Sequence, residues 1–237
     1  MPAALVFGAR NLGRAVARRL VADGWCAACV ARSAETLDRL AADAPGVVGL
    51  QADARVEDDV RRVVADARDG LGGLDLVVVA ISPAGGRSGG GVELAGAPAA
   101  VFDPYLDDLL PALSTVLRVA GGALAEQGHG TYVQVTGGSA RRGMPGRGPW
   151  ASAAFATRGM LQSAASELRG RGVHAALLVV DAVIESDKTR GFLEGKPTDY
   201  AAGEDDVAAA VAYLAAQSPR AWTHELVLTP AGDAWVP

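Results

Sequence analysis

The sequence predicts a doubly wound α/β fold, with one parallel β-sheet covered by helices on both faces. Apolar runs of strand length alternate with segments of helical periodicity along the chain. Their short connections are typical of successive βαβ units. Apart from Asp75, the run at 74–81 is apolar throughout, as expected for a strand that helices cover on both sides. With 237 residues and no visible repeat or linker, we predict a single domain over residues 1–237, of the Rossmann type.

Glycine, proline and capping residues set the expected bounds of the elements. The predicted strands are 5–7, 25–31, 47–52, 74–81, 131–136, 175–184 and 225–229. The predicted helices are 13–22, 35–43, 56–68, one that begins at 103–104, 150–169 and 204–216. Asp103 is expected to cap the fourth helix with Pro104 at its first position, and Pro111 should kink or restart it. No element is predicted for the loop at 83–91, and 186–203 is expected to form a substrate lid.

Composition and charge argue against several classes of function. The net charge is −5, whereas binding to nucleic acid needs a basic face. No uninterrupted apolar run reaches membrane-spanning length and no signal-peptide pattern is visible, so we expect a cytoplasmic protein. Cys26 and Cys29 form a C-x-x-C within a predicted strand, where residues three apart face opposite sides, and no redox pair is expected. The three histidines lack metal-ligand spacing, so no metal is expected.

A glycine-rich turn, Gly8-Ala9-Arg10-Asn11-Leu12-Gly13, joins the first strand to the first helix. Such a turn lets the backbone approach a pyrophosphate at the helix N-terminus. Asn11 stands near the middle glycine position of such turns, and asparagine tolerates left-handed backbone. Arg32 and Ser33, and no carboxylate, follow the second strand. Together Arg10 and Arg32 favour a ribose 2′-phosphate and hence NADP(H), although they could equally be solvated loop residues.

The order of these features resembles the short-chain dehydrogenase/reductase family over essentially the whole chain. The family motif T-G-x-x-x-G-x-G corresponds to a turn that is one residue shorter here, with Phe7 in place of the threonine. The resemblance implies that Asp53 contacts adenine and Ser186 the nicotinamide amide, and it places Ala80 in the family's N-N-A-G. Asp53 could equally cap the next helix. The implied cofactor-binding set is Gly8, Arg10, Asn11, Leu12, Gly13, Arg32, Ser33, Asp53, Ala80 and Ser186.

The resemblance also implies that the family's catalytic residues are replaced. The motif Y-x-x-x-K becomes Trp150-Ala151-Ser152-Ala153-Ala154, and the serine thirteen residues earlier falls on Gly137. An alternative register puts Arg158 on the lysine but breaks the spacing to Glu167-Leu168. In the family the tyrosine gives a proton to the substrate and the lysine lowers the pKa of the tyrosine. An indole N–H is no acid, so we expect reduction without this proton donor.

Replacement catalytic residues are sought at the carboxyl ends of the strands. The candidates are Ser82, Thr136, Ser139 and Asp181, together with Trp150. Asp181 follows an apolar run and could act as acid or base, or simply cap a turn. Trp150 could form a flat wall for an aromatic ligand, or only fill the vacated pocket. Basic residues in the preceding loop could meet an anionic substrate or be solvated, namely Arg141, Arg142 and Arg147.

Three functions remain open. The first is an atypical NADP(H)-dependent reductase of small-molecule metabolism, acting on a bulky apolar or aromatic substrate such as an activated alkene or an iminium. The second is a non-redox cyclase, isomerase or dehydratase that uses the old substrate pocket, with or without a nucleotide. The third is a catalytically inactive subunit. Long fourth and fifth helices rich in small residues, as in the family, suggest a homodimer or homotetramer.

Overall fold

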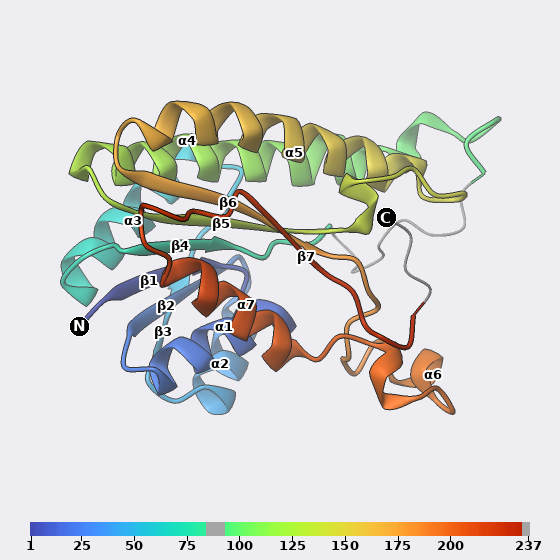
Figure 1. Ribbon diagram of the computed structural model, residues 1–237, viewed down its shortest axis with the longest axis horizontal. Coiled ribbons are helices and arrows are strands. Elements are labelled where there is room, and N and C mark those ends of the chain that lie inside the picture. The colour runs from blue at the N-terminus through green and yellow to red at the C-terminus, as the bar shows by residue number, and fades with distance from the viewer. Residues whose placement is uncertain (84–92, 234–237) are drawn as a thin grey trace.

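The computed structural model, which describes residues 1–83 and 93–233, has three layers, with a central sheet between two sets of helices (Figure 1). Seven parallel strands form the sheet in the order β3-β2-β1-β4-β5-β6-β7. The strand order reverses direction between β1 and β4, which marks the topological switch point. The strands are β1 Ala3–Phe7, β2 Cys26–Ala31, β3 Val47–Gln51, β4 Leu76–Val79, β5 Gly130–Gly137, β6 Val173–Val180 and β7 Glu225–Leu228. The predicted fold class is confirmed.

Six long helices cover the two faces of this sheet. One layer comprises α1 Asn11–Ala22, α2 Ala34–Asp43 and α7 Glu204–Ala215, and the other comprises α3 Glu57–Leu71, α4 Leu110–Gln127 and α5 Gly148–Arg169. Alternation along β1 divides the core between them, because Leu5 and Phe7 pack with the α3–α5 layer while Ala4 and Val6 pack with the α1–α2–α7 layer. The short helix α6, Arg190–Leu193, lies near the end of the sheet where the strands finish (Figure 1). This arrangement leaves the carboxyl ends of the strands facing one side.

The fourth helix begins differently from its prediction. Residues Pro104–Leu109 are a π-helix, and α4 starts at Leu110. Asp103 is itself in the helical region and its side chain caps nothing, so the predicted cap is wrong. The restart expected at Pro111 is confirmed, because proline has no N–H to donate to the preceding turn. We conclude that the proline, and not the aspartate, sets the geometry of this helix.

The helical segment Pro104–Gln127 is 24 residues long and apolar enough, by length and composition, to cross a membrane. In the sequence, Asp107, Asp108 and Arg118 interrupt the apolar run of this segment. More than half of the apolar window (56%) is buried. Its buried side chains belong to the core cluster that joins α3, α4, α5 and the sheet. Packing in the protein core therefore explains why this helical segment is apolar.

Strand β6 ends earlier than the sequence predicts, at Val180 in place of residue 184. Asp181 N–H still donates to Leu228 O at 2.9 Å, but its carboxylate turns to Arg142. The apolar residues that follow pack at the end of the sheet without pairing as a strand, apart from a single bridge between Ile184 and Ala202. The loop predicted at 83–91 lies, beyond Pro83, outside the described residues.

Candidate functional site

A cavity of about 920 Å³ opens at the carboxyl ends of the strands. Its lining comes from the segments that follow β1 to β6, so it crosses the switch point between β1 and β4. Ligands of open α/β sheets bind at this position. The volume is at the upper end of the range of about 300–1,000 Å³ for small-molecule sites. It can hold a dinucleotide or another ligand of comparable size.

The glycine-rich turn after β1 forms one wall of this cavity. Gly8 has a φ of 116°, and a Cβ atom added to it would lie 2.7 Å from the Ala80 carbonyl oxygen. Asn11 has a φ of 35°, the one positive value at a non-glycine residue in the described part of the chain, which confirms its predicted left-handed conformation. A Cβ atom on Gly13 would lie 1.7 Å from the Gly8 carbonyl oxygen. The turn is therefore tight and depends on small or left-handed residues at these positions.

The N-terminus of α1 opens onto the cavity without a side-chain cap. Arg10 occupies the N-cap position and makes no capping hydrogen bond. Arg10, Asn11 and Leu12 line the cavity, whereas Gly13 does not. The Gly13 N–H donates to Arg10 O at 3.0 Å. An uncapped helix start leaves backbone N–H groups and a positive dipole end available to an anion. This is the geometry that a phosphate group needs.

Two arginines extend this wall to the end of β2. Arg10 and Arg32 both line the cavity, and within the described residues neither guanidinium has a hydrogen-bond or ion-pair partner. Ser33 also lines the cavity, but its Oγ is the cap of α2 and accepts the Thr36 N–H at 3.4 Å. The predicted cofactor role of Ser33 therefore competes with a capping role. The two arginines keep their full hydrogen-bonding capacity for a ligand.

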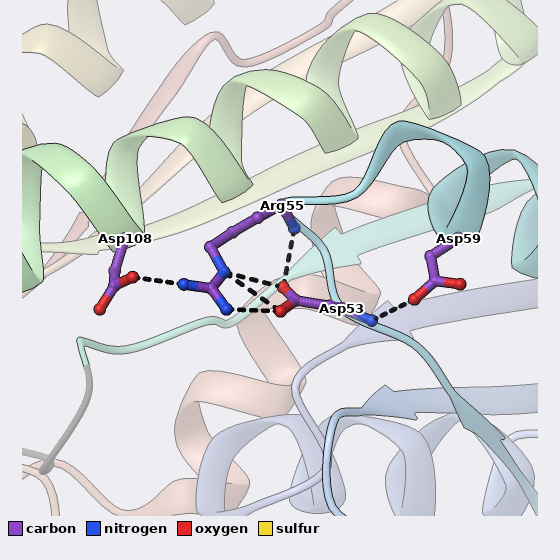
Figure 2. Close-up of polar contacts among 4 residues, drawn as sticks. All are labelled: Asp53, Arg55, Asp59 and Asp108. Atoms are coloured by element: carbon purple, nitrogen blue, oxygen red, sulfur yellow. Dashed lines mark hydrogen bonds and ion pairs between the residues drawn. The ribbon is translucent and has the colours of Figure 1, made fainter.

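Asp53 lies at the end of β3 and is held by a neighbouring arginine (Figure 2). Arg55 Nη2 donates to Asp53 Oδ2 at 2.6 Å, and Arg55 Nη1 donates to Asp108 Oδ1 at 2.5 Å. The hydrogen bond from Arg55 is the main reason why the pKa of Asp53 lies below its usual value. Asp53 does not cap α3, whose N-cap is Val56. Its backbone N–H donates to Asp59 Oδ2 at 2.8 Å.

Arg55 is the residue of this region that sequence reasoning missed. It joins the end of β3 to the π-helix that precedes α4, across one edge of the cavity (Figure 2). The only local signal was an arginine two residues after an aspartate at a strand end. Asp108 is 53 residues away in sequence, so its participation had no signal in the sequence. Contact between Asp53 and adenine stays a prediction, and Arg55 lies beside Asp53 at this place.

Gly137 and Trp150 face one another at the end of β5. A Cβ atom on Gly137 would lie 3.6 Å from Trp150 Nε1. The Trp150 ring lines the cavity and packs against Tyr105 with ring centroids 6.1 Å apart. Its N–H has no hydrogen-bond partner among the described residues. Ala154 follows one turn later on α5 and is 2% exposed. This end of the cavity therefore presents an indole where the sequence resemblance expects a phenol.

Arg158 cannot serve this end of the cavity. Its Nε and Nη2 donate to the two carboxylate oxygens of Glu225 on β7, at 2.6 and 2.9 Å. It does not line the cavity. The structure thus disfavours the alternative register that places Arg158 on the family's lysine.

Asp181 lies at the end of β6 in an ion pair. Arg142 Nη1 donates to its Oδ2 at 2.5 Å and Arg142 Nη2 to its Oδ1 at 3.3 Å. The carboxylate also lies against Gly138, where a Cβ atom would be 1.8 Å from Oδ1. Asp181 lines the cavity as a carboxylate in an ion pair and not as a turn cap, and its catalytic role stays a prediction. Its acid or base role has no support in this arrangement, because the guanidinium takes up both of its oxygens.

The remaining predicted residues divide between the cavity and the core. Ser139 is fully buried in the 3₁₀ segment Gly138–Ala140, and it does not line the cavity. Its Oγ is buried without a hydrogen-bond partner among the described residues, and its catalytic role stays a prediction. Ala80 and Ser186 do line the cavity. Ser186 Oγ lies 3.1 Å from Thr189 Oγ1.

Comparison with known proteins places this geometry in a family. Residues 2–191 match the family model described as short chain dehydrogenase. The chain belongs to the short-chain dehydrogenase family. It is 29% identical over 174 residues to dehydrogenase/reductase SDR family member 4 of Bos taurus, which covers 71% of this chain and 60% of the bovine protein. The match thus spans less than two thirds of that relative's length.

Two further comparisons agree with this assignment. A short-chain dehydrogenase/reductase of Armillaria gallica is 31% identical over 185 residues, covering 72% of this chain and 66% of the fungal protein. The structure of an alcohol dehydrogenase from the archaeon Thermococcus sibiricus, complexed with 5-hydroxy-NADP, superposes with a TM-score of 0.83. It covers 100% of both chains at 24% identity. That likeness shows the fold of this short-chain dehydrogenase.

The cavity of this short-chain dehydrogenase is positively charged although the whole chain has a net charge of −5. Six cationic side chains line it, against four carboxylates, a surplus of two positive charges among the described residues. The cations are Arg10, Arg32, Arg55, Arg142, Arg147 and Lys188, and the carboxylates are Asp53, Asp108, Asp181 and Asp233. Clefts lined by one sign of charge attract ligands of the other sign. The cavity therefore suits an anionic ligand.

The segment 186–203, predicted as a lid, borders the cavity of this short-chain dehydrogenase. Lys188, Thr189 and Phe192 contribute to the lining. Lys196 Nζ lies 4.7 Å from the centre of the Tyr200 ring, which packs this segment on itself. The Ile184–Ala202 bridge joins its two ends. The position agrees with a substrate cover, and its opening and closing stay a prediction.

Proposed function

We propose that this protein is an NADP(H)-dependent oxidoreductase that reduces a bulky, apolar or aromatic small molecule without a tyrosine–lysine proton donor. One observation carries the cofactor assignment: two guanidiniums without partners, those of Arg10 and Arg32, line the cavity where β1 and β2 end. An NAD-selective Rossmann domain has a carboxylate at the end of β2, which binds the ribose hydroxyls. Guanidiniums at this place would instead bind a 2′-phosphate. The archaeal alcohol dehydrogenase described above holds an NADP derivative.

The residues present fit a dinucleotide. The Gly8 and Gly13 backbones leave no room for a Cβ atom, so the turn brings the uncapped start of α1 close to the cavity. Backbone N–H groups there would hold the pyrophosphate, Arg10 and Arg32 the 2′-phosphate, and Ser186 would lie toward the nicotinamide. When bound, the reduced nicotinamide would supply a hydride. The protein's own contribution is to hold and orient, which the rigid turn and the strand ends allow.

The chemistry at the other end follows from Gly137, Trp150 and Ala154. On our alignment these three positions lack a hydroxyl, a phenol and an ammonium group. Trp150 can donate one hydrogen bond from Nε1 and offer a flat apolar face, but it releases no proton at any ordinary pH. Loss of a general acid typically costs about 10²- to 10⁴-fold in rate. We therefore propose a substrate whose reduction does not require a proton from this position.

Of the two substrate classes considered, an activated alkene fits the charge of the cavity better than an iminium. When an alkene conjugated to a carbonyl accepts hydride at its β-carbon, negative charge develops on the carbonyl oxygen, and solvent can protonate the α-carbon afterwards. The Trp150 N–H and the positive surplus of the cavity would stabilise that oxygen. An iminium is cationic and would be repelled by the same surplus. The proposal is thus reduction of a carbon–carbon double bond next to a carbonyl.

Calorimetric titration with NADPH and with NADH tests the proposal. We expect saturable NADPH binding in the micromolar range and weaker NADH binding. Arg32→Gln should weaken NADPH binding by about 10- to 100-fold, the worth of a charge-assisted contact, and leave NADH binding unchanged. Arg39→Gln is the matched control, because Arg39 lies on the exposed side of α2 and pairs with Glu35. Absence of NADPH binding at millimolar concentration would exclude this reading and leave the non-redox enzyme or the inactive subunit.

A further inference from the structure

The end of the cavity around Trp150 offers hydrogen-bond donors that have no acceptor. Arg147 directly precedes α5, lines the cavity and is half-buried. Its guanidinium has no hydrogen-bond or ion-pair partner within the described residues, and neither does the Trp150 N–H. The nearby carboxylate of Asp181 is paired with Arg142. A guanidinium that is partly withdrawn from water without an acceptor is a poor arrangement unless a ligand completes it.

Arg147 and Arg32 follow strands that are not neighbours in the sheet. Arg32 follows β2, whereas Arg147 and Trp150 follow β5. In the sheet, β1 and β4 lie between these two strands. Three strand spacings of about 4.8 Å separate the two ends by roughly 14 Å. Arg32 and Arg147 therefore stand at different ends of the cavity, and Arg10, which follows β1, lies next to Arg32 in strand order.

Apolar side chains also line the cavity that Arg147 lines. Trp150, Met144, Leu109 and Phe192 all line the cavity. The Trp150 ring is tilted by 60° against Tyr105, which fixes its orientation from behind. A flat aromatic frame can pack on such a wall. A guanidinium fork beside the wall matches the two oxygens of a carboxylate.

We propose that the substrate carries a carboxylate on an aromatic or polycyclic frame, with Arg147 binding the carboxylate and Trp150 packing on the frame. This deepens the proposed function, on which it rests for the identity of the site as a substrate pocket. It also gives one of the basic residues in the loop before α5 a role in binding an anionic substrate. Arg147 faces the site, whereas Arg141 lines a separate, smaller cavity beside Val227, Thr229 and Pro230.

Binding of aromatic carboxylates to the protein saturated with NADP⁺ tests the inference. Benzoate, 2-naphthoate and anthracene-2-carboxylate, each paired with its neutral amide, are titrated by calorimetry. We expect at least one carboxylate to bind about tenfold or more tightly than its amide. Arg147→Gln should remove this preference, and Arg147→Lys should restore only part of it, because an ammonium lacks the fork. Arg141→Gln is the matched control and should leave binding unchanged.

The possible results separate this inference from the proposed function. If NADP⁺ binds but no carboxylate exceeds its amide, or if Arg141→Gln weakens binding as much as Arg147→Gln, the inference is wrong and the cofactor assignment stands. If inorganic phosphate displaces the carboxylate at equal concentration, the site is a general anion site, and the inference is also wrong. If an Arg147-dependent preference appears in protein that binds no NADP⁺, the proposed function fails and the carboxylate site stands. Unchanged melting temperatures of the variants show that folding is intact.

Discussion

Replacement of Gly13 by alanine tests whether the turn after β1 is built for a nucleotide. Gly13 lies in the first turn of α1, and a Cβ atom there would be 1.7 Å from the Gly8 carbonyl oxygen and 3.4 Å from a Val6 methyl group. Close carbon–oxygen contacts in proteins are about 3.3 Å or longer. The start of α1 must therefore move from the turn by roughly 1.6 Å, the difference between these distances. A movement of this size displaces the N–H groups that we assign to the pyrophosphate.

The expected cost follows from two opposing effects. Overpacking typically destabilises a protein by about 1–3 kcal/mol or more, whereas alanine in place of glycine stabilises a helix interior by roughly 1 kcal/mol. A backbone carbonyl cannot turn aside like a side chain, so the overpacking cost should lie at its upper end, and we expect a net loss of about 2 kcal/mol. In a chain of this size each kcal/mol lowers the melting temperature by about 2–4 °C. The variant should melt lower by several degrees and bind NADPH at least tenfold more weakly.

Gly159→Ala is the matched control. Gly159 lies within α5, and a Cβ atom there would meet nothing within 4 Å. This variant should gain the helix stabilisation alone, about 0.5–1 kcal/mol, and melt slightly higher. Circular dichroism with and without NADPH measures both effects. If Gly13→Ala melts no lower than the wild type, the close contact is not restrictive; if it melts lower but binds NADPH normally, the turn does not hold the phosphates.

Two further predictions concern buried titratable groups. Burial raises the pKa of the Cys29 thiol to about 12. A thiol reagent at pH 8 should therefore modify the half-buried Cys26 first, and Cys29 only after unfolding. Early modification of Cys29, found by peptide mass spectrometry, would contradict this prediction. Burial lowers the pKa of His174 below 6.5, so its contribution to stability is present above pH 6.5 and is lost as the pH falls through the lowered pKa. The wild type should therefore lose more melting temperature between pH 7.5 and 5.5 than His174→Gln, and equal losses would refute the assignment.

The sequence predicted the fold because the signal for each element is local. Apolar runs, helical periodicity and glycines at helix ends identify the strands and helices, and their alternation determines the parallel sheet. The error at the end of β6 has a physical cause. Val183 and Ile184 are partly buried like strand residues, but they pack as a loop at the sheet end. An apolar run therefore records burial, whereas a strand also needs a hydrogen-bonding neighbour. The single domain, the homo-oligomer and the cytoplasmic location stay predictions.

The site was predictable only where it depends on backbone. The left-handed Asn11 and the tight contact of Gly13 with Gly8 follow from residue type within one turn. The ion pair between Arg142 and Asp181 joins residues 39 apart in sequence, so nothing local indicated that this carboxylate would be paired. The burial of Ser139 had no signal for a similar reason, since spacing cannot tell which side of a 3₁₀ turn faces a cavity. Side-chain partners that come from different strand ends appear only once the sheet is assembled.

The arrangement of charge connects the two proposals. An acidic chain repels anions at long range, but salt screens charges beyond about 8 Å at physiological ionic strength, so a ligand at the strand ends experiences mainly the lining of the cavity. Two of the lining cations, Arg55 and Arg142, already have carboxylate partners. Arg10 and Arg32 at one end and Arg147 at the other make no hydrogen bond or ion pair through their guanidiniums among the described residues. A 2′-phosphate on the cofactor and a carboxylate on the substrate would supply acceptors for these cations at both ends.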